Sequence, residues 1–421
     1  LCGGGERWKR LLRQGVEEKV RSAPAITAST RTIGFINCAH FADHFMLLVY
    51  ATAVIAMAPE FGLSYGAGIA LATGLFACFG LFALPAGWLA DKWGRRPMLA
   101  LFWFGGGACL ILTGLASTPW QLVAAMTAMG VFAAIYHPVG TSMLISVAGA
   151  SGRALGLNGV FGNLGVAAAP LATGLILDSW GWRWAFMLPG LIMLAFGLAY
   201  LMAVPKGTAA PGATAASAAR PAGALDLRLI VVIVGLTVFA GGFTFNTVTV
   251  ALPKFVVEEL PGFSAALAYA GTIATTLYLA GAVTQLIVGR LIDRFPIGAT
   301  FVTLALLQVA GFSGMALLSG PAALAAAAMS LSAVYGQVLI NDLIIARNVS
   351  DRWRARAYAM RYTMGFAASA SVVPLIALIH RPETGYGPVF AIMTGFALLI
   401  AASAGFYAVV TARATALKPA E

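Results

Sequence analysis

The chain has 421 residues, of which 60% are hydrophobic and only 10% are charged. Soluble globular proteins carry about 25% charged residues, so this composition excludes a soluble enzyme, a nucleic-acid-binding module and a disordered protein. The formal net charge of +11 is expected to orient the chain in a lipid bilayer rather than to bind nucleic acid, because little of its surface faces water.

Apolar segments of membrane-spanning length recur along the whole chain. A bilayer core requires roughly 20 apolar residues per helix, and the sequence predicts twelve such helices. In the first half we expect them at 32–57, 65–88, 98–117, 120–143, 154–178 and 184–204. In the second half we expect them at 228–256, 265–288, 299–319, 322–346, 357–379 and 387–411.

A stretch rich in Ala, Pro, Gly and Ser separates the two sets of spans. It covers 208–224, and its composition is typical of a flexible linker. We therefore expect five parts along the chain: an N-terminal tail at 1–31, a six-helix bundle at 32–204, a linker at 205–227, a second six-helix bundle at 228–411 and a C-terminal tail at 412–421.

Basic residues divide unevenly between the two sides of the expected membrane. With both termini and the linker on one side, only Arg183, Lys254 and Arg381 of the 26 Lys and Arg residues fall on the other. Positive residues concentrate in cytoplasmic loops. We therefore expect a multi-pass protein of the inner (cytoplasmic) membrane with both termini in the cytoplasm.

Two loops, at 87–97 and 289–296, carry the same pattern. The first reads GWLADKWGRRP and the second GRLIDRFP, with Gly, Leu and Asp at the same offsets. Internal symmetry between two halves is typical of transporters built from repeats.

The first loop resembles the signature G-x-L-a-D-r-x-G-r-r of the major facilitator superfamily. The resemblance implies an all-α polytopic membrane protein with twelve transmembrane helices in two pseudo-symmetric six-helix bundles, present as a monomer. It also implies a latch between the halves, made of Gly87, Asp91, Gly94 and Arg95 and, in the second copy, Asp293 and Arg294. The alternative is a basic loop that only sets the topology.

A finer resemblance connects the chain with drug exporters of the fosmidomycin-resistance type. It depends on His40-Phe-Ala-Asp43-His44, Tyr136-His137-Pro138 and Phe161-Gly162-Asn163-Leu164-Gly165. Residues 165–174, GVAAAPLATG, are similar to the antiporter motif g-x-x-x-G-P-x-x-G-G. The fourth span lacks the membrane-embedded Arg of many drug/proton antiporters, so their proton mechanism does not transfer directly.

Polar residues gather on one face of the first span. Asn37, His40, Asp43 and His44 fall within about 120° of one another on a helix. Because a free imidazole titrates near pH 6.5, Asp43 with His40 or His44 is expected to carry a proton. A divalent-metal site formed by His40, Asp43, His44 and His137 is one alternative, and a structural hydrogen-bond cluster is the other.

Further polar residues are expected to line a central cavity or to gate it. The predicted substrate-binding residues are Asn37, His137, Asn246, Gln337 and Asn341. Asp342 and Arg361 are expected to pair near the cytoplasmic mouth, either as a gate or as a static contact between helix ends.

The phosphate-binding loop G-x-x-x-x-G-K-[ST] does not occur in the sequence, which disfavours ATP as the energy source. We expect no cofactor, no catalytic residue and a proton gradient as the driving force. The predicted function is export of small amphiphilic molecules or drugs by a proton-coupled antiporter. The alternatives are transport of a metabolite, organic anion or metal ion such as iron, and a non-transporting membrane scaffold or sensor.

Overall fold

The computed structural model describes residues 28–148, 152–205, 227–263, 266–292, 294–349 and 351–416. Within these residues the chain folds into helices joined by short loops. The N-terminal tail before Ala28, nearly all of the expected linker and the last residues of the C-terminal tail lie outside them. The domain boundaries drawn from the sequence therefore stay predictions.

The helices follow the expected spans. The first half contains α2 (Ala28–Glu60), α3 (Tyr65–Ala70), α4 (Thr73–Leu81), α5 (Ala83–Trp93), α6 (Arg95–Gly114), α7 (Pro119–Ala133), α8 (Tyr136–Ala148), α9 (Gly152–Trp180) and α10 (Trp182–Ala203). The second half contains α11 (Leu227–Glu259), η1 (Pro261–Phe263), α12 (Leu267–Ile292), α13 (Ile297–Leu317), α14 (Gly320–Asn348), α15 (Asp351–Ile379) and α16 (Gly387–Ala416).

Two expected spans are broken near a proline. The second span becomes α3, α4 and α5, with a 48° bend between Leu81 and Ala83, and the fourth becomes α7 and α8. A proline has no N–H to donate and its ring collides with the carbonyl four residues earlier. Pro85 would meet Leu81, and Pro138 would meet Ala134, so each break lies at the carbonyl that the proline cannot bond.

Among the described residues, ten helices are long and apolar enough to cross a bilayer, and the bent unit of α3, α4 and α5 makes an eleventh. The remaining expected span is α15. Only its part from Thr363 to Ile379 is apolar, because Arg352, Arg354 and Arg356 occupy its beginning.

The helices pack mainly within their own half of the chain. In the first half, α2 packs against α8, α9 and α10, and α6 packs against α7 and α10. In the second half, α13 packs against α14 and α16, and α11 packs against α14, α15 and α16. The two halves meet where α9 lies along α12 and where α3 and α4 lie along α15.

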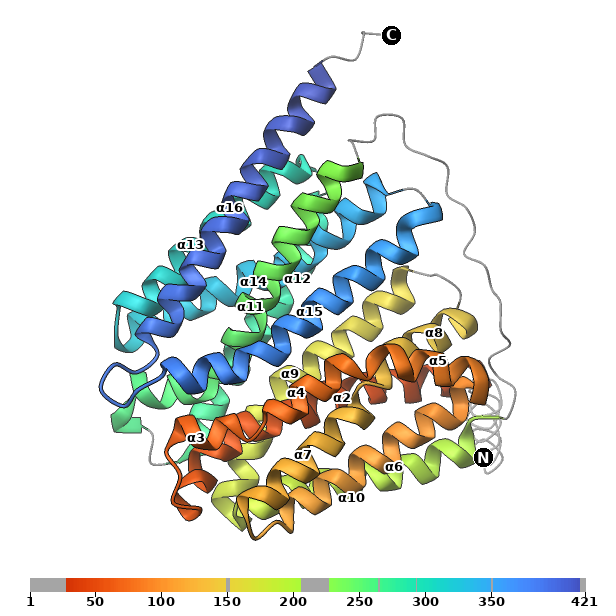
Figure 1. Cartoon of the computed structure of the whole chain (residues 1–421), viewed down its shortest axis with the longest axis vertical. Helices are drawn as coiled ribbons and strands as arrows, with labels where there is room; N and C mark the ends of the chain where they lie inside the picture. The colour runs from red at the N-terminus through yellow and green to blue at the C-terminus, as the bar shows by residue number, and fades with distance from the viewer. Residues whose placement is uncertain are drawn as a thin grey trace, which may run out of the picture.

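The two halves are joined at one end of the molecule and separate toward the other (Figure 1). At the joined end, which we call the closed end, the hydroxyls of Tyr65 in α3 and Tyr386 are 2.7 Å apart. The Asp178 carboxylate accepts hydrogen bonds from the backbone N–H groups of Leu267 and Ala268, at 3.2 and 2.8 Å, and so caps α12. The opposite end, where α5 ends and α11 begins, is called the divergent end.

Exposed tryptophans lie at both ends of the helices. Trp88 and Trp93 are exposed at the divergent end, and Trp120, Trp180 and Trp184 are exposed at the closed end. Indole rings concentrate at the two membrane–water interfaces. The two sets therefore mark the depth to which lipid surrounds the protein.

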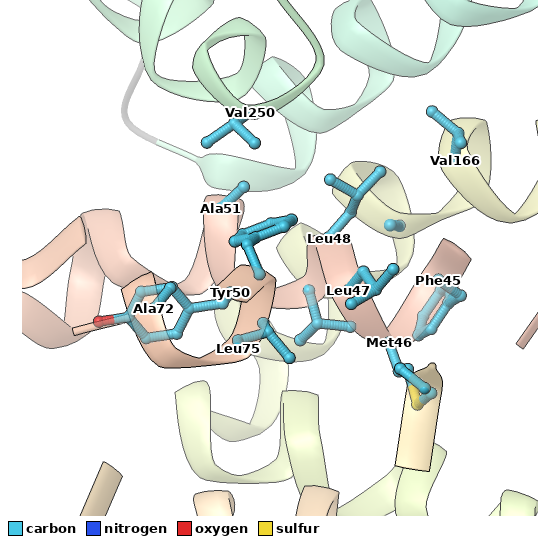
Figure 2. Close-up of a cluster of buried hydrophobic side chains, with 14 of the residues drawn as sticks. Phe45, Met46, Leu47, Leu48, Tyr50, Ala51, Ala72, Leu75, Val166 and Val250 are labelled. Atoms are coloured by element: carbon cyan, nitrogen blue, oxygen red, sulfur yellow. The ribbon is translucent and has the colours of Figure 1, made fainter. Parts of the chain in front are cut away.

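The middle of α2 is the most enclosed segment of the fold. Figure 2 shows side chains of α2 packed against Ala72 and Leu75 on one side and against Val166 of α9 and Val250 of α11 on others. Tyr50 of α2 donates a hydrogen bond of 2.5 Å to the Gly68 carbonyl. A helix in this position carries its polar side chains into the interior of the protein, beside α8 and α9 of the same half.

Small residues make the seam between α9 and α12. A Cβ atom on Gly271 would overlap the Pro170 carbonyl oxygen, and one on Gly174 would lie 2.6 Å from the Leu267 carbonyl oxygen. Thr275 donates a 2.5 Å hydrogen bond to the Ala167 carbonyl. The part of the antiporter-like stretch from Ala167 to Gly174 therefore touches the other half, where glycines let the backbones approach, whereas Gly165 faces Phe41 of α2.

We predict that Gly271→Ala destabilises the protein by about 1–3 kcal/mol, because the added methyl group forces α9 and α12 apart. The denaturation midpoint of the detergent-solubilised protein measures this. Gly159→Ala on α9 is the control, since a Cβ there meets open space. Equal denaturation midpoints for the two variants would contradict the close approach of α9 and α12 at Gly271.

Candidate functional site

The polar face of α2 meets two other helices inside the first half. Asn37, His40, Asp43 and His44 come from α2, while Tyr136 and His137 begin α8. The break before Pro138 places His137 beside the α2 cluster. The structure thus brings together all four ionisable residues that the sequence assigns to proton coupling or to the metal alternative.

Three imidazole rings form the core of this cluster. His40, His44 and His137 each offer a ring nitrogen that lies within 4.8 Å of the other two. The ring centroids are 5.0 Å apart for His40 and His44, and 5.5 Å apart for each of these with His137. We call these three residues and Asp43 the imidazole cluster.

Asp43 is the most buried member of the imidazole cluster. Its side chain is 0% exposed, and its Oδ2 lies 3.4 Å from Nε2 of His137, which is 22% exposed. Among the described residues, neither carboxylate oxygen accepts a hydrogen bond of ordinary geometry. A buried carboxylate is costly unless it is paired and hydrogen-bonded, so this group is suited to holding a proton or to facing a bound cation.

Asn158 of α9 organises the surroundings of His40. Its side-chain Nδ2 donates to Asn37 Oδ1 and to the Tyr136 hydroxyl, both at 2.9 Å. Its backbone carbonyl oxygen lies 2.7 Å from His40 Nδ1. A carbonyl oxygen only accepts, so Nδ1 of His40 carries a hydrogen and the lone pair of the neutral ring is on Nε2.

Two neighbours hold the His40 ring in place. It stacks on Tyr136 with centroids 4.7 Å apart, and a Cβ atom on Gly162 would lie 2.6 Å from its Cε1 and Nε2 atoms. Sequence reasoning missed Asn158. The only signal for it is a polar residue near the start of the fifth expected span, where polarity is common, so its bridging role depends on three helices meeting.

The predicted cavity residues of the second half, Asn246, Gln337 and Asn341, have their hydrogen-bond partners inside that half. Gln337 and Asn341 of α14 are buried in a polar network with Gln308 of α13 and Thr237 of α11. Gln308 donates to the Gln337 side chain, and Thr237 donates to Asn341 Oδ1 at 3.2 Å. Asn246 of α11 is partly exposed, and its Nδ2 donates to the carbonyl of Gly242 at 2.8 Å. Within the described part of the chain, these side chains form their hydrogen bonds inside the second half and not with the imidazole cluster.

The signature loop lies at the divergent end. Gly94 connects α5 to α6 and has a φ of +92°, a backbone conformation that favours glycine. Gly87 of α5 faces Pro138. Arg96 donates to the carbonyls of Val204 and Leu201 at 2.7 and 2.6 Å, which caps the end of α10. Within the described residues Asp91 and Arg95 form no ion pair with each other.

The second copy and the predicted mouth pair are at the same end. Asp293 lies outside the described residues, and Arg294 is exposed in the turn before α13. Arg361 Nη1 is 3.2 Å from Asp342 Oδ1, so the predicted pairing is formed. It joins α15 to α14 within the second half, so this contact by itself does not bridge the halves; its role as a gate stays a prediction.

An all-helical membrane fold in two halves, with ionisable groups buried between helices, is typical of membrane transporters. The family description "Major Facilitator Superfamily" matches residues 34–346. The chain belongs to this superfamily and is a multi-pass membrane transporter, not an enzyme.

Curated relatives and solved structures agree with this family. The chain is 36% identical over 109 residues to the puromycin resistance protein pur8 of Streptomyces alboniger, covering 25% of this chain and 22% of the relative. It is 30% identical over 171 residues to the multidrug resistance protein Stp of Mycobacterium tuberculosis, covering 37% and 31%. The similarity to drug-resistance transporters is thereby confirmed, although the matches span less than a third of each relative.

Structural similarity extends over nearly the whole chain. A bacterial homologue of the human lysosomal transporter Spinster superposes with a TM-score of 0.68 at 16% identity, covering 94% of this chain and 100% of that one. This confirms the all-helical major facilitator fold expected from the sequence.

We predict that Asn158→Ala lowers the free energy of unfolding by about 1–3 kcal/mol, because Asn37 and Tyr136 lose buried partners. Chemical denaturation in detergent measures the loss. Asn348→Ala serves as the control, since Asn348 only donates to a carbonyl of its own helix. An Asn158→Ala protein as stable as the control would contradict the bridging role.

Proposed function

We propose that the protein is a proton-coupled antiporter that exports small amphiphilic molecules or drugs by alternating access. The observation that carries the proposal is the buried Asp43 carboxyl group facing His137 between the helices of a drug-resistance-type transporter. Ionisable residues inside membrane proteins usually mark ion or substrate pathways. Asp43, with His40 or His44, is the proposed proton carrier.

The cluster is suited to coupling because its charge depends on its occupant. With a proton on Asp43, the group is neutral and compatible with its apolar surroundings. Without it, the negative charge is compensated only by a cation nearby, such as a protonated imidazole or a positively charged part of a substrate. Proton and substrate can then replace each other at one place, which is what exchange requires.

Alternating access is supported by the shape of the molecule. The halves are joined at the closed end and separate at the divergent end (Figure 1). In the proposed cycle, the seam between α9 and α12 parts at the closed end, and the loop with Gly87, Asp91, Gly94 and Arg95 meets the second half. Asp293, Arg294, Asp342 and Arg361 are proposed as its counterparts there.

The proposed orientation follows from the basic residues. Arg183, Lys254 and Arg381, the three expected outside the cytoplasm, all lie at the closed end: Arg183 beside Glu60, Lys254 beside Tyr65, and Arg381 next to His380. We place the closed end outside the inner membrane and the divergent end in the cytoplasm. The substrate cavity is proposed in a monomer, between Asn37 and His137 on one half and Asn246 on the other. The proposed lining by Gln337 and Asn341 requires their buried network with Gln308 and Thr237 to open.

We predict that Asp43→Asn abolishes proton-driven export while the protein still inserts and folds, because an amide cannot take up or release a proton. Transport of a fluorescent drug in inverted vesicles with an imposed pH gradient measures this. Glu60→Gln, a carboxylate change at the surface of the same half, should transport normally. Undiminished export by Asp43→Asn would remove Asp43 from the mechanism.

A divalent metal ion is the second candidate for the transported cation, favoured by the three clustered imidazoles. Imidazole nitrogens bind Zn²⁺ at about 2.0–2.1 Å, so nitrogens within 4.8 Å of one another need only a small inward movement to share one ion. Asp43 would supply an oxygen and a balancing charge. This candidate replaces the proton at the same residues, so the two are exclusive.

Metal binding separates the two candidates. If the cargo is a metal ion, purified protein binds Co²⁺ with the visible spectrum of a nitrogen-rich site, and His44→Ala lowers the affinity by at least about tenfold, since one of three ligands is lost. His380→Ala is the matched control, because His380 is the remaining histidine of the four in the chain. Export that is unaffected by chelators, together with no Co²⁺ spectrum, would exclude the metal.

A further inference from the structure

A polar cavity lies at the closed end, away from the imidazole cluster. Its volume is about 510 Å³, which is within the range of small-molecule sites. The walls come from the ends of α11 and α13, from the loop 380–387 and from Tyr65. Tyr65 is the one lining residue from the first half, so it stands across a cavity that otherwise belongs to the second half.

A lysine of the cavity wall places its ammonium group between a carboxylate and an aromatic ring. Lys254 Nζ is 3.5 Å from Glu258 Oε1 and 5.5 Å from the centroid of the Tyr65 ring. Ammonium groups are attracted to aromatic faces within about 6 Å. His380 approaches the same carboxylate oxygen at 2.7 Å, which fixes the position of Glu258.

The remaining lining also favours a cation with an aromatic or apolar body. The rings of Tyr65, His380 and Tyr386 lie with their centroids 4.6 to 6.4 Å apart. Glu259 adds a second carboxylate, which accepts a 2.7 Å hydrogen bond from Gly320 N–H. Two carboxylates against one ammonium group leave the walls poorly suited to an anion.

We infer that this cavity is a binding site for lipophilic organic cations, and that Lys254 occupies the place of the ligand's charged group. Lys254 is tethered to α11, four residues before Glu258, and its ammonium group can withdraw along its flexible stem. A ligand cation then takes its contacts with Glu258 and Tyr65. The binding stands by itself, whereas its role as the last site before release rests on the proposed function.

Ligand binding and opening are linked at this site. The contact between Lys254 and Tyr65 joins α11 of the second half to α3 of the first. A ligand that displaces Lys254 removes this contact between the halves and inserts itself between Tyr65 and Glu258. The ligand then takes over this contact, so moving Tyr65 away from Glu258 when the closed end opens weakens the hold on the ligand and favours its release.

The test measures equilibrium binding of tetraphenylphosphonium to the purified full-length protein, with tetraphenylborate as an anion of the same shape. Lys254→Met should raise the tetraphenylphosphonium affinity by about fivefold, because a competing tethered cation is removed. Glu258→Gln should lower it by at least about tenfold. Glu383→Gln, in the neighbouring loop, is the matched control and should leave it unchanged.

Two further variants keep the outcome clear. Tyr65→Phe retains the ring and should bind more tightly than Tyr65→Leu, which should bind several-fold more weakly than the wild type. Lys254→Met preserves the contact of Glu258 with His380, so it remains informative even when Glu258→Gln fails to fold. An unchanged or lower tetraphenylphosphonium affinity in Lys254→Met, or the same response of tetraphenylborate, would overturn the site.

Failure of this site and failure of the proposed function are distinguishable. Asp43→Asn should still bind tetraphenylphosphonium at the closed end with wild-type affinity, although its proton-driven export is lost. If Asp43→Asn loses binding together with export, the cation site belongs to the imidazole cluster and not to the closed-end cavity.

Discussion

The cost of placing a carboxyl group among packed helices is the constraint on which the rest of the structure depends. Asp43 is completely buried, and its nearest ionisable partner is His137, 3.4 Å away. Such a group is compatible with an apolar interior only when a proton or a neighbouring positive charge neutralises it. The helices around it are arranged accordingly. The break before Pro138 turns His137 toward α2, and Asn158 fixes His40 and Tyr136 at its side.

The contacts around the buried Asp43 carboxyl group lie within the first half, and they differ in kind from the contacts between the halves. Within the first half, α2, α8 and α9 are cross-linked by hydrogen bonds of Asn158, so the imidazole cluster moves as part of one body. Between the halves, contacts are fewer and of another kind. Small residues let α9 and α12 approach closely, and Asp178, Tyr65 and Lys254 provide polar contacts at the closed end. Thr275, which bonds to Ala167, and the pair of Asn163 and Gln285 add partly buried polar contacts along α9 and α12. When this interface parts, these groups need new partners, which water entering between the halves can supply.

The signature loop has a structural role in addition to its proposed role as a latch between the halves. Arg96 is bound to the last carbonyls of α10, and Gly94 makes the turn that no other residue type adopts easily. These two residues hold the loop in shape, whereas Asp91 and Arg95 form no ion pair with each other. A loop that is fixed at its base and exposes its charges is suited to meeting another surface, which is consistent with the proposed contact in the opposite state.

The sequence by itself determined the class of protein, the positions of the twelve spans and the polar face of α2. Apolar length, charge asymmetry and helical period are local properties that a bilayer imposes on any chain. The sequence also predicted the pair of Asp342 and Arg361. The tertiary structure alone decided the other polar contacts. Asn158 joins His40, Asn37 and Tyr136, and Gln337 turns into the core beside Gln308. Lys254, Glu258 and Tyr65 form a cavity from segments almost 200 residues apart. These contacts arise where separate helices cross, and the order of residues along one helix carries no information about the face that a distant helix presents to it.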